Sequence, residues 1–236
     1  MIVVVNGQPR SGSTLAFNIA RRLAERFGTV SEVGGATASR IQELLDWEAE
    51  NPTDAISVFK CHYFIPMPRH FYNVKLIYTC RNPLDVLTSS MRVPEKAVVF
   101  EKMGPAPFIG GLEFDYSHFC SMINLPLHTK TMCRYEDFYN DTNEGLALQI
   151  SILMGFHTST GMLQEIVDEF SKEKMKQIGD AMFDTAAKVY PETHIRAGHV
   201  SKSFGAPGSW RGNLSPELEE RVRHQFKMWM KECFWR

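Results

Sequence analysis

The chain has 236 residues and is 44% hydrophobic, so it can bury the core of one sizeable domain. Its 26 basic and 27 acidic residues leave a net charge of −1, which gives no global support to a role on nucleic acid or on a membrane surface. The 5 cysteines lack C-x-x-C spacing, which favours reduced thiols and a cytoplasmic location. We find no internal repeat, linker, signal peptide or membrane-length apolar run, and we expect a single domain over residues 1–236.

The beginning of the chain predicts a strand, a tight polar turn and a helix. Residues 2–5 are apolar and β-branched, as is typical of a central parallel strand that is covered on both faces. The turn at residues 6–14 contains glycines and several hydroxyl side chains, and Leu15, Ile19 and Leu23 then recur at helical spacing. A strand, turn and helix in this order direct backbone N–H groups and a helix N-terminus at an anion.

Residues 7–14 match the phosphate-loop pattern G-x-x-x-x-G-K-[ST] with one departure, because Ser13 stands in place of the lysine. That lysine normally reaches the β- and γ-phosphates, so a nucleoside triphosphate would be held poorly here. The positive charge lies instead at Arg10, inside the loop, where it suits a nucleotide whose 5′ end carries only two anionic groups. The alternative for this segment alone is an ordinary turn between a strand and a helix.

Two further strands end in polar residues that are candidates for a site. Residues 28–33 predict a strand, and its Glu32 could point into a site at the strand's end, although a solvated glutamate is the ordinary interpretation. Residues 55–62 predict another strand, and Lys60 and His62 project from the same face of it. Such strand ends are where α/β proteins place ligands, and the lysine charge would favour a neutral, basic imidazole. Alternatively, the histidine only caps the strand and the lysine extends into solvent.

The strand expected at residues 74–80 leads into a helix through Arg81. Ser89 lies eight residues further on, about two helical turns along, so that an arginine and a serine can converge on one phosphate. The alternative is a simple pair between Arg81 and Asp85.

The second half of the chain predicts helices and one more strand. We expect residues 93–112 to form an irregular, mobile segment that acts as a lid or contacts an acceptor, because it contains several prolines and glycines. A strand is expected at residues 129–135, and helices at 114–124, 142–154, 160–178 and from Ser215 onward. These elements predict an α/β fold with phosphate-loop-like topology, in which a central parallel sheet of about five strands is flanked by helices on both faces.

Six segments of the chain resemble, in order, motifs of the sulfotransferases that use 3′-phosphoadenosine 5′-phosphosulfate (PAPS). Residues 9–15 (PRSGSTL) resemble the loop for the 5′-phosphosulfate, and residues 81–89 (RNPLDVLTS) resemble the segment for the 3′-phosphate. Residues 59–62 (FKCH) are similar to a K-T-H stretch whose histidine is the catalytic base. The remaining matches are residues 134–137 (RYED), 196–198 (RAG) and 208–211 (GSWR), which are similar to Y-E-D, R-K-G and G-D-W-K motifs. The resemblance spans residues 2 to about 214 and implies a sulfotransferase.

The resemblance also implies roles for the matching residues, with PAPS as donor, 3′,5′-ADP as product and no metal. His62 would remove the proton from a hydroxyl or amine of the acceptor, which would be a small molecule or a glycan, in an in-line displacement. Lys60 and Arg10 would stabilise charge on the sulfuryl oxygens and on the leaving phosphate. Tyr135 would lie near the adenine. The residues implied in donor binding are Arg10, Ser11, Gly12, Ser13, Thr14, Arg81, Ser89, Tyr135, Arg196 and Gly198.

Some features depart from the family pattern. Ala197 replaces the lysine of R-K-G, so one contact with the 3′-phosphate would be missing or supplied by Lys202. The loop arginine, Arg10, is more like Golgi-type members, several of which use a glutamate base, so Glu32 is a rival to His62. A small-molecule kinase, which the missing loop lysine disfavours, and a non-catalytic nucleotide-binding module are the alternative classes. The acceptor, the oligomeric state and the role of the loop at 198–208 stay open.

Overall fold

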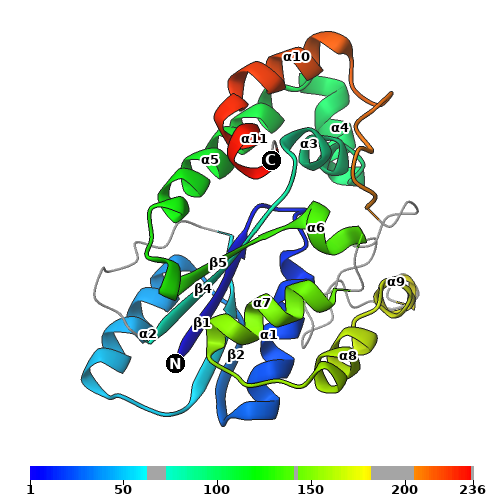
Figure 1. The fold of residues 1–236 in the computed structure, drawn as a ribbon. Coiled ribbons are helices and arrows are strands. Elements are labelled where there is room, and N and C mark those ends of the chain that lie inside the picture. Colours follow the sequence, from blue (N-terminus) through cyan, green and yellow to red (C-terminus); the bar gives the residue numbers. More distant parts are fainter. Residues whose placement is uncertain (63–72, 141–142, 182–204, 235–236) are drawn as a thin grey trace.

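The computed structural model describes residues 1–62, 73–140, 143–181 and 205–234 (Figure 1). At its centre is a parallel sheet of five strands in the order β2-β3-β1-β4-β5. The prediction of a single-domain α/β fold with such a sheet is confirmed. The strands are β1 (Ile2–Gly7), β2 (Val30–Gly35), β3 (Ile56–Lys60), β4 (Val74–Cys80) and β5 (Lys130–Arg134). The described helices are α1 (Ser13–Phe27), α2 (Ala38–Glu50), α3 (Pro83–Met91), α4 (Pro94–Met103), α5 (Ala106–Ile123), α6 (Tyr135–Asn140), α7 (Glu144–Met154), α8 (Thr160–Glu169), α9 (Lys172–Ala181), α10 (Pro216–Gln225) and α11 (Lys227–Phe234), with a short 3₁₀ turn at Leu127–Thr129.

The pairing register brings the ends of the central strands to one edge of the sheet. Val5 of β1 lies beside Lys60 of β3, and Gly7 of β1 lies beside Thr79 of β4. Because the strands are parallel, their carboxyl ends share this edge, which we call the carboxyl edge. The loops that leave it can present polar groups to a ligand, as in other open α/β sheets.

The two faces of the sheet bury separate hydrophobic clusters, and β1 contributes to both. Val3 and Val5 pack into one cluster with side chains of α1, α7 and α8. Ile2 and Val4 pack into the other cluster, which includes residues of α2, α5 and the C-terminal helices. A strand covered on both faces needs apolar residues at successive positions, which explains the uninterrupted apolar run in β1. Helices therefore flank the sheet on both sides, as expected.

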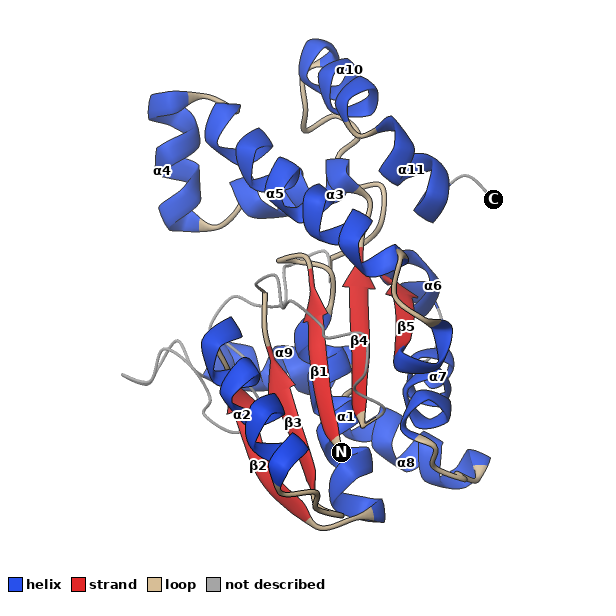
Figure 2. Cartoon of the chain, turned by 90° about the vertical axis from the view of Figure 1, so that its left-hand side faces the viewer, coloured by secondary structure: helices blue, strands red, loops and turns tan. Residues whose placement is uncertain are grey.

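Five helices, α3, α4, α5, α10 and α11, gather beyond the carboxyl edge (Figures 1 and 2). We call α4 and α5, residues 94–123, the helical cover. Trp229 of α11 is fully buried and stacks on Tyr116 and Phe119 of α5, with ring centroids 6.0 and 5.8 Å apart. Aromatic pairs of this kind contribute about 0.5–1.5 kcal/mol each beyond their buried area, so they fix α5 against the C-terminal helices.

The helical cover corrects one expectation, because residues 93–112 are not an irregular loop. Pro94 begins α4 and Pro107 lies in the first turn of α5, where the missing proline N–H removes no helical hydrogen bond. Gly104 ends α4 with a φ of 67°, a conformation that favours glycine. The two glycines inside α5 cost roughly 1 kcal/mol each in helix propensity, and the buried face of that helix outweighs this cost.

Two predicted helices are interrupted. The helix expected over residues 160–178 ends at Glu169, and α9 begins at Lys172. The C-terminal helix is interrupted at Phe226, between α10 and α11. Its predicted beginning is confirmed, because the Ser215 side chain accepts a hydrogen bond from the N–H of Leu218 at 3.3 Å.

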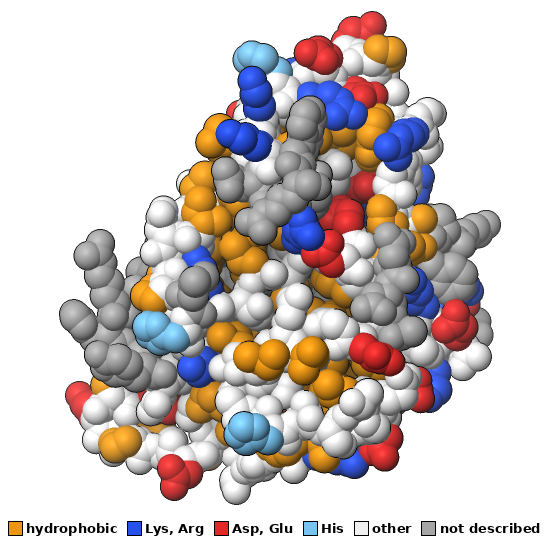
Figure 3. Space-filling view, in the orientation of Figure 1, with side chains coloured by type: hydrophobic (Ala, Val, Ile, Leu, Met, Phe, Trp, Pro, Cys, Tyr) orange, Lys and Arg blue, Asp and Glu red, His pale blue; other side chains and the backbone are white. Residues whose placement is uncertain are grey.

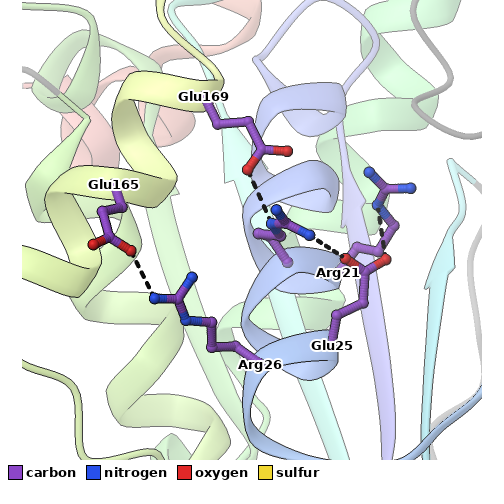
Figure 4. A network of polar contacts seen from close by, with 6 residues as sticks. Arg21, Glu25, Arg26, Glu165 and Glu169 are labelled. Atoms are coloured by element: carbon purple, nitrogen blue, oxygen red, sulfur yellow. Dashed lines mark hydrogen bonds and ion pairs between the residues drawn. The ribbon is translucent and has the colours of Figure 1, made fainter.

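Ion pairs join α1 to α8 on the outside of the molecule (Figure 4). Arg22 lies 2.9 Å from Glu169, and Arg26 lies 2.6 Å from Glu165. These side chains are well exposed, so each pair contributes roughly 0–1 kcal/mol. The pairs align α8 along α1, while the buried cluster between the two helices supplies most of the stability.

The surface agrees with the balanced composition. On the face shown in Figure 3, Lys and Arg side chains are interspersed with Asp and Glu, and this face carries no broad basic area. Within the described residues, no helix is long and apolar enough to cross a membrane.

Candidate active site

The phosphate loop, residues 7–14, has a backbone that turns tightly at the carboxyl edge. Arg10 adopts a positive φ of 71°, which is uncommon for a residue with a side chain, and Gly12 has a φ of 84°. A Cβ atom at Gly12 would lie 2.7 Å from the ring of Phe138, so only glycine fits there. The hydroxyl of Ser11 is fully buried and donates to the carbonyl of Gln8 at 2.6 Å. The loop is therefore held in one conformation by its own residues.

The N–H groups of this loop are not all available to a ligand. The N–H of Ser11 donates to the carbonyl of Gln8 at 3.3 Å, so the expected contribution of that group to anion binding is corrected. The Ser11 hydroxyl also lies 2.6 Å from the hydroxyl of Thr79, at the end of β4. The Ser11 side chain thus fixes the loop against β4. The N–H groups at the start of α1 are of the kind that a helix N-terminus can offer to an anion.

Two arginines that lie far apart in the sequence meet beside the loop. Arg81 is only 2% exposed, and its Nη1 donates to the carbonyl of Arg10 at 3.1 Å. Within the described residues, neither guanidinium has a carboxylate within 4 Å, and the Nε of Arg81 is buried without a hydrogen-bond partner. Burial lowers the pKa of Arg10 below its ordinary value, and the charge of Arg81 lowers it further. Two like charges without a counter-charge are the arrangement expected of an anion site.

Ser89 of α3, expected to converge with Arg81 on one phosphate, contacts the other arginine of this pair, Arg10. Its hydroxyl accepts a hydrogen bond from the Nε of Arg10 at 3.0 Å. The alternative pairing of Arg81 with Asp85 does not occur. Asp85 is buried and accepts instead from the N–H of Gly208 at 2.7 Å and from the N–H of Trp210 at 3.2 Å. The acidic residue of α3 therefore holds the segment at 208–210 in place and leaves the arginine charge uncompensated.

Lys60 and His62 both reach the phosphate loop, but at opposite ends of it. The Nζ of Lys60 donates to the hydroxyl of Thr14 at 2.7 Å, at the beginning of α1. The Nδ1 of His62 lies 2.8 Å from the carbonyl oxygen of Gly7, at the end of β1. Because a carbonyl can only accept, Nδ1 carries the proton of the neutral ring and Nε2 carries the lone pair. The strand itself ends at Lys60, so the expectation that both residues belong to β3 is wrong for His62.

Glu32 is placed differently from His62. It lies three residues before the end of β2, opposite Ser57 in the register, and not at the carboxyl edge as expected. Its carboxylate is 42% exposed and pairs with Arg40 of α2 at 3.1 Å. The structure therefore brings His62, and not Glu32, to the phosphate loop.

A scan against protein families matches the description "Sulfotransferase domain" over residues 2–234. The chain is a member of the sulfotransferase family. The family and the enzyme class inferred from the six motifs are therefore confirmed. A search of curated protein sequences finds no significant match.

Solved structures with the same fold come from related enzymes. A retinol dehydratase complex with retinol and PAP is 17% identical to this chain and has a TM-score of 0.61. The match covers 100% of this chain and 82% of the retinol dehydratase chain. A second retinol dehydratase complex, with androsterone and the inactive cofactor PAP, is 16% identical with a TM-score of 0.65 at the same coverage. A mouse sulfotransferase, SULT7A1, complexed with PAP is 17% identical with a TM-score of 0.61, over 98% of this chain and 84% of that one.

Of the remaining motif residues, Tyr135 lies beside the arginine pair. Tyr135 begins α6, and the Arg81 guanidinium lies over its ring at 4.2 Å from the centroid. Burial raises the pKa of Tyr135 to about 12, so the phenol is neutral. Gly205, which packs against the Tyr135 hydroxyl, accepts a hydrogen bond from Arg81 Nη2 at 2.7 Å. Arg196, Gly198 and the substitute Lys202 lie outside the described residues.

Several supporting residues were missed from the sequence. Gln8 accepts a hydrogen bond from the N–H of Arg81 at 2.7 Å and so joins the loop to β4. Glu136 accepts from the N–H of Asn82 at 2.9 Å, and burial raises the pKa of Glu136 to about 7. His118 of α5 is buried near His62. The Y-E-D motif contained a signal for Glu136, whereas Gln8 and His118 follow only from the three-dimensional arrangement.

Proposed function

We propose that this sulfotransferase moves the sulfuryl group of PAPS to a hydroxyl or amine of a small acceptor. One observation carries the proposal. Arg10 and Arg81 form a pair of guanidinium groups without a carboxylate counter-charge in the described structure, and the imidazole of His62 lies at the other end of the same loop. An anion site and a base at one carboxyl edge are what group transfer from a nucleotide requires.

The residues present fit this donor. PAPS would supply a sulfuryl group on a good leaving phosphate. Arg81 and Ser89, with Arg196 and Gly198 from outside the described residues, would hold its 3′-phosphate, and Tyr135 would lie near the adenine. Arg10 and the loop residues from Gly12 to Thr14 would hold the 5′ side, while Ser11 fixes the loop. The buried Arg81 Nε without a partner supports this fit, since a buried donor gains most from an added anion.

His62 would act as the general base. Its Nδ1–H is held by the Gly7 carbonyl, so the lone pair on Nε2 is the one that can take the acceptor's proton. Lys60 and Arg10 would stabilise the charge that develops on the sulfuryl oxygens and on the leaving phosphate. Glu32 is the weaker candidate because it is paired with Arg40 and lies away from the carboxyl edge.

The acceptor is proposed to be a small molecule. The two retinol dehydratase complexes contain retinol and androsterone, and the PAP present in all three neighbours supports the donor. The helical cover lies beyond the same edge of the sheet as the loop, and its exposed apolar side chains, which include Val98, Met103 and Phe114, favour such an acceptor.

A two-step experiment tests this function against its alternatives. Thermal unfolding is measured with 3′,5′-ADP and with ATP–Mg, and we expect a clear rise in Tm with the first and little with the second. A larger rise with ATP–Mg would favour a kinase. Transfer of radiolabelled sulfate from PAPS is then screened over a panel of hydroxyl and amine acceptors. Binding of 3′,5′-ADP without any transfer or loss of sulfate would indicate a non-catalytic module.

A further inference from the structure

A chain of hydrogen bonds connects the helical cover to the proposed base. The Nε2 of His118, on α5, lies 3.4 Å from the Nδ2 of Asn6, near the end of β1. The Oδ1 of Asn6 accepts from the N–H of Gly7 at 2.6 Å. The carbonyl of Gly7 in turn lies 2.8 Å from the Nδ1 of His62. Both backbone polar groups of Gly7 are therefore fixed: its N–H by the Asn6 side chain and its carbonyl by the His62 ring.

The direction of each hydrogen bond follows from its partners. The Gly7 N–H can only donate, so the oxygen of the Asn6 amide faces Gly7 and the NH₂ group faces His118. The NH₂ group also only donates, so His118 Nε2 must carry a lone pair and the ring must be neutral. Burial, together with a smaller effect of a charged His62 nearby, lowers the pKa of His118 to about 4, in agreement with these directions.

The Gly7 peptide has little freedom to turn away from His62. The following N–H, of Gln8, donates to the Thr79 carbonyl at 3.2 Å, so that the Gly7 carbonyl points to the opposite side, toward His62. A Cβ atom at Gly7 would lie 2.2 Å from the Thr79 hydroxyl, which shows how closely β4 packs here.

We propose that Asn6 and His118 are positioning residues that hold the Gly7 backbone so that His62 stays in the Nδ1–H tautomer with a basic Nε2. This inference rests on the proposed role of His62 as the base. It explains why two polar side chains are buried, Asn6 at 0% exposure at the end of an apolar strand and His118 at 4% exposure on a mainly apolar face of α5. Each would cost stability if it served packing alone, because an apolar residue would fill the same space without a polar group to satisfy.

The groups around His118 come from β4 and from α5 itself. Tyr78 of β4 meets its ring edge-on, with centroids 5.5 Å apart. Asp115 lies one turn earlier on α5, and burial raises the pKa of Asp115 to about 7 against the opposing charge of Lys96. Burial in these surroundings keeps His118 neutral near pH 7, as its hydrogen bond from Asn6 requires.

Two substitutions at His118 separate positioning from packing. His118→Phe keeps a ring and removes the acceptor, whereas His118→Gln can place an amide oxygen near the position of Nε2. With 4-nitrophenol as acceptor and PAPS as donor, we expect the Phe variant to lose about 10- to 100-fold in kcat with little change in 3′,5′-ADP affinity. The Gln variant should recover most of that loss. His157→Phe, at an exposed histidine between α7 and α8, is the control and should match the original protein.

A spectroscopic readout tests the same inference without using activity. In protein with ¹⁵N-labelled histidine, NMR should find the proton of His62 on Nδ1 and a lone pair on His118 Nε2 at pH 7. In the His118→Phe variant, the ¹⁵N signals of His62 should indicate a mixture of the two tautomers. The limb of the pH–rate profile that reports the protonation of His62 should also shift in this variant.

Several outcomes would overturn the inference. These are an Nε2–H tautomer for His62 in the original protein, an unchanged tautomer and kcat in His118→Phe, or equal losses in the Phe and Gln variants. If His118→Phe does not fold, the tautomers of the original protein and the kcat of the Gln variant decide. If the original protein transfers no sulfate at all, the proposed function fails, and the NMR result still decides whether Asn6 and His118 order His62.

Discussion

The phosphate loop and the helical cover lie at the same edge of the sheet but are built in different ways. The loop has positive φ angles at Arg10 and Gly12 and is fixed by backbone and hydroxyl hydrogen bonds from neighbouring strands. The cover consists of two helices that are held by aromatic packing against α11, and it buries two ionisable side chains, Asp115 and His118. In the proposed function, anion binding would therefore depend mainly on one short segment, whereas the position of the helical cover depends on packing against helices from the end of the chain.

The sharpest way to test this division is to remove the proposed base. His62→Ala should lower the rate of transfer by about 10²–10⁴-fold, as for other general bases, and leave 3′,5′-ADP affinity nearly unchanged. Single-turnover kinetics and calorimetry would measure the two quantities. Glu32→Gln is the matched comparison and should cost much less, because Glu32 pairs with Arg40 at the surface. The assignment fails if the Glu32 variant is inactive and the His62 variant is not.

The next effect concerns the cation inside the loop. Arg10→Ala should reduce kcat by about 10²-fold and affinity for 3′,5′-ADP by a smaller factor, because the charge on the leaving phosphate grows in the transition state. Arg10→Lys should recover part of the rate. Loss of product affinity with an intact kcat would show that Arg10 only anchors the donor.

A smaller effect is expected at the other arginine. Charge-assisted hydrogen bonds contribute about 1.5–3 kcal/mol, so Arg81→Ala should weaken 3′,5′-ADP binding by about 10- to 100-fold. Binding of 5′-AMP, which lacks the 3′-phosphate, should change little. Arg221→Ala, at an exposed position on α10, is the control for loss of a positive charge. Equal losses for both nucleotides would show that Arg81 does not read the 3′-phosphate.

The smallest effect concerns the helical cover. Burial raises the pKa of Asp115 from its ordinary 3.8 to about 7, so the unfolded chain loses this proton at a lower pH than the folded protein does. Stability from this group is therefore complete below about pH 4 and is lost as the pH rises through about 7. Asp115→Asn removes this loss and should be more stable than the original protein by about 1–3 kcal/mol at pH 8 but not at pH 4. Parallel stability curves for the two proteins over this range would contradict the prediction.

The structure near the phosphate loop was easier to predict from the sequence than the structure of the helical cover. The bounds of β4 and the position of Arg81 beside the phosphate loop were predictable, because a parallel sheet brings the ends of its strands together whatever lies between them. The contact of Ser89 with Arg10 was not predicted, because the sequence pairs Ser89 with Arg81. Residues 93–112 were mistaken for a loop, because proline at the start of a helix and proline in a loop look alike in sequence.

Two site residues illustrate why the rest could not be predicted. His118 is separated from Asn6 by 112 residues, and nothing local distinguishes it from any other histidine on a helix. Glu32 has the right residue type on the right strand, but only the register with β3 shows that it lies short of the carboxyl edge. Side-chain roles that depend on strand register or on helix docking therefore need the structure.

The contacts of α3 with residues 205–210 have a consequence for synthesis on the ribosome. Arg81 and Asp85 are made early, but the Gly205 carbonyl and the N–H groups of Gly208 and Trp210 that they bind are made more than 120 residues later. A nascent chain that has formed the sheet would still present the Asp85 carboxylate without these donors. The proposed nucleotide site should therefore form only after translation has passed residues 205–210, so that donor binding by a nascent chain would report that this segment has been made.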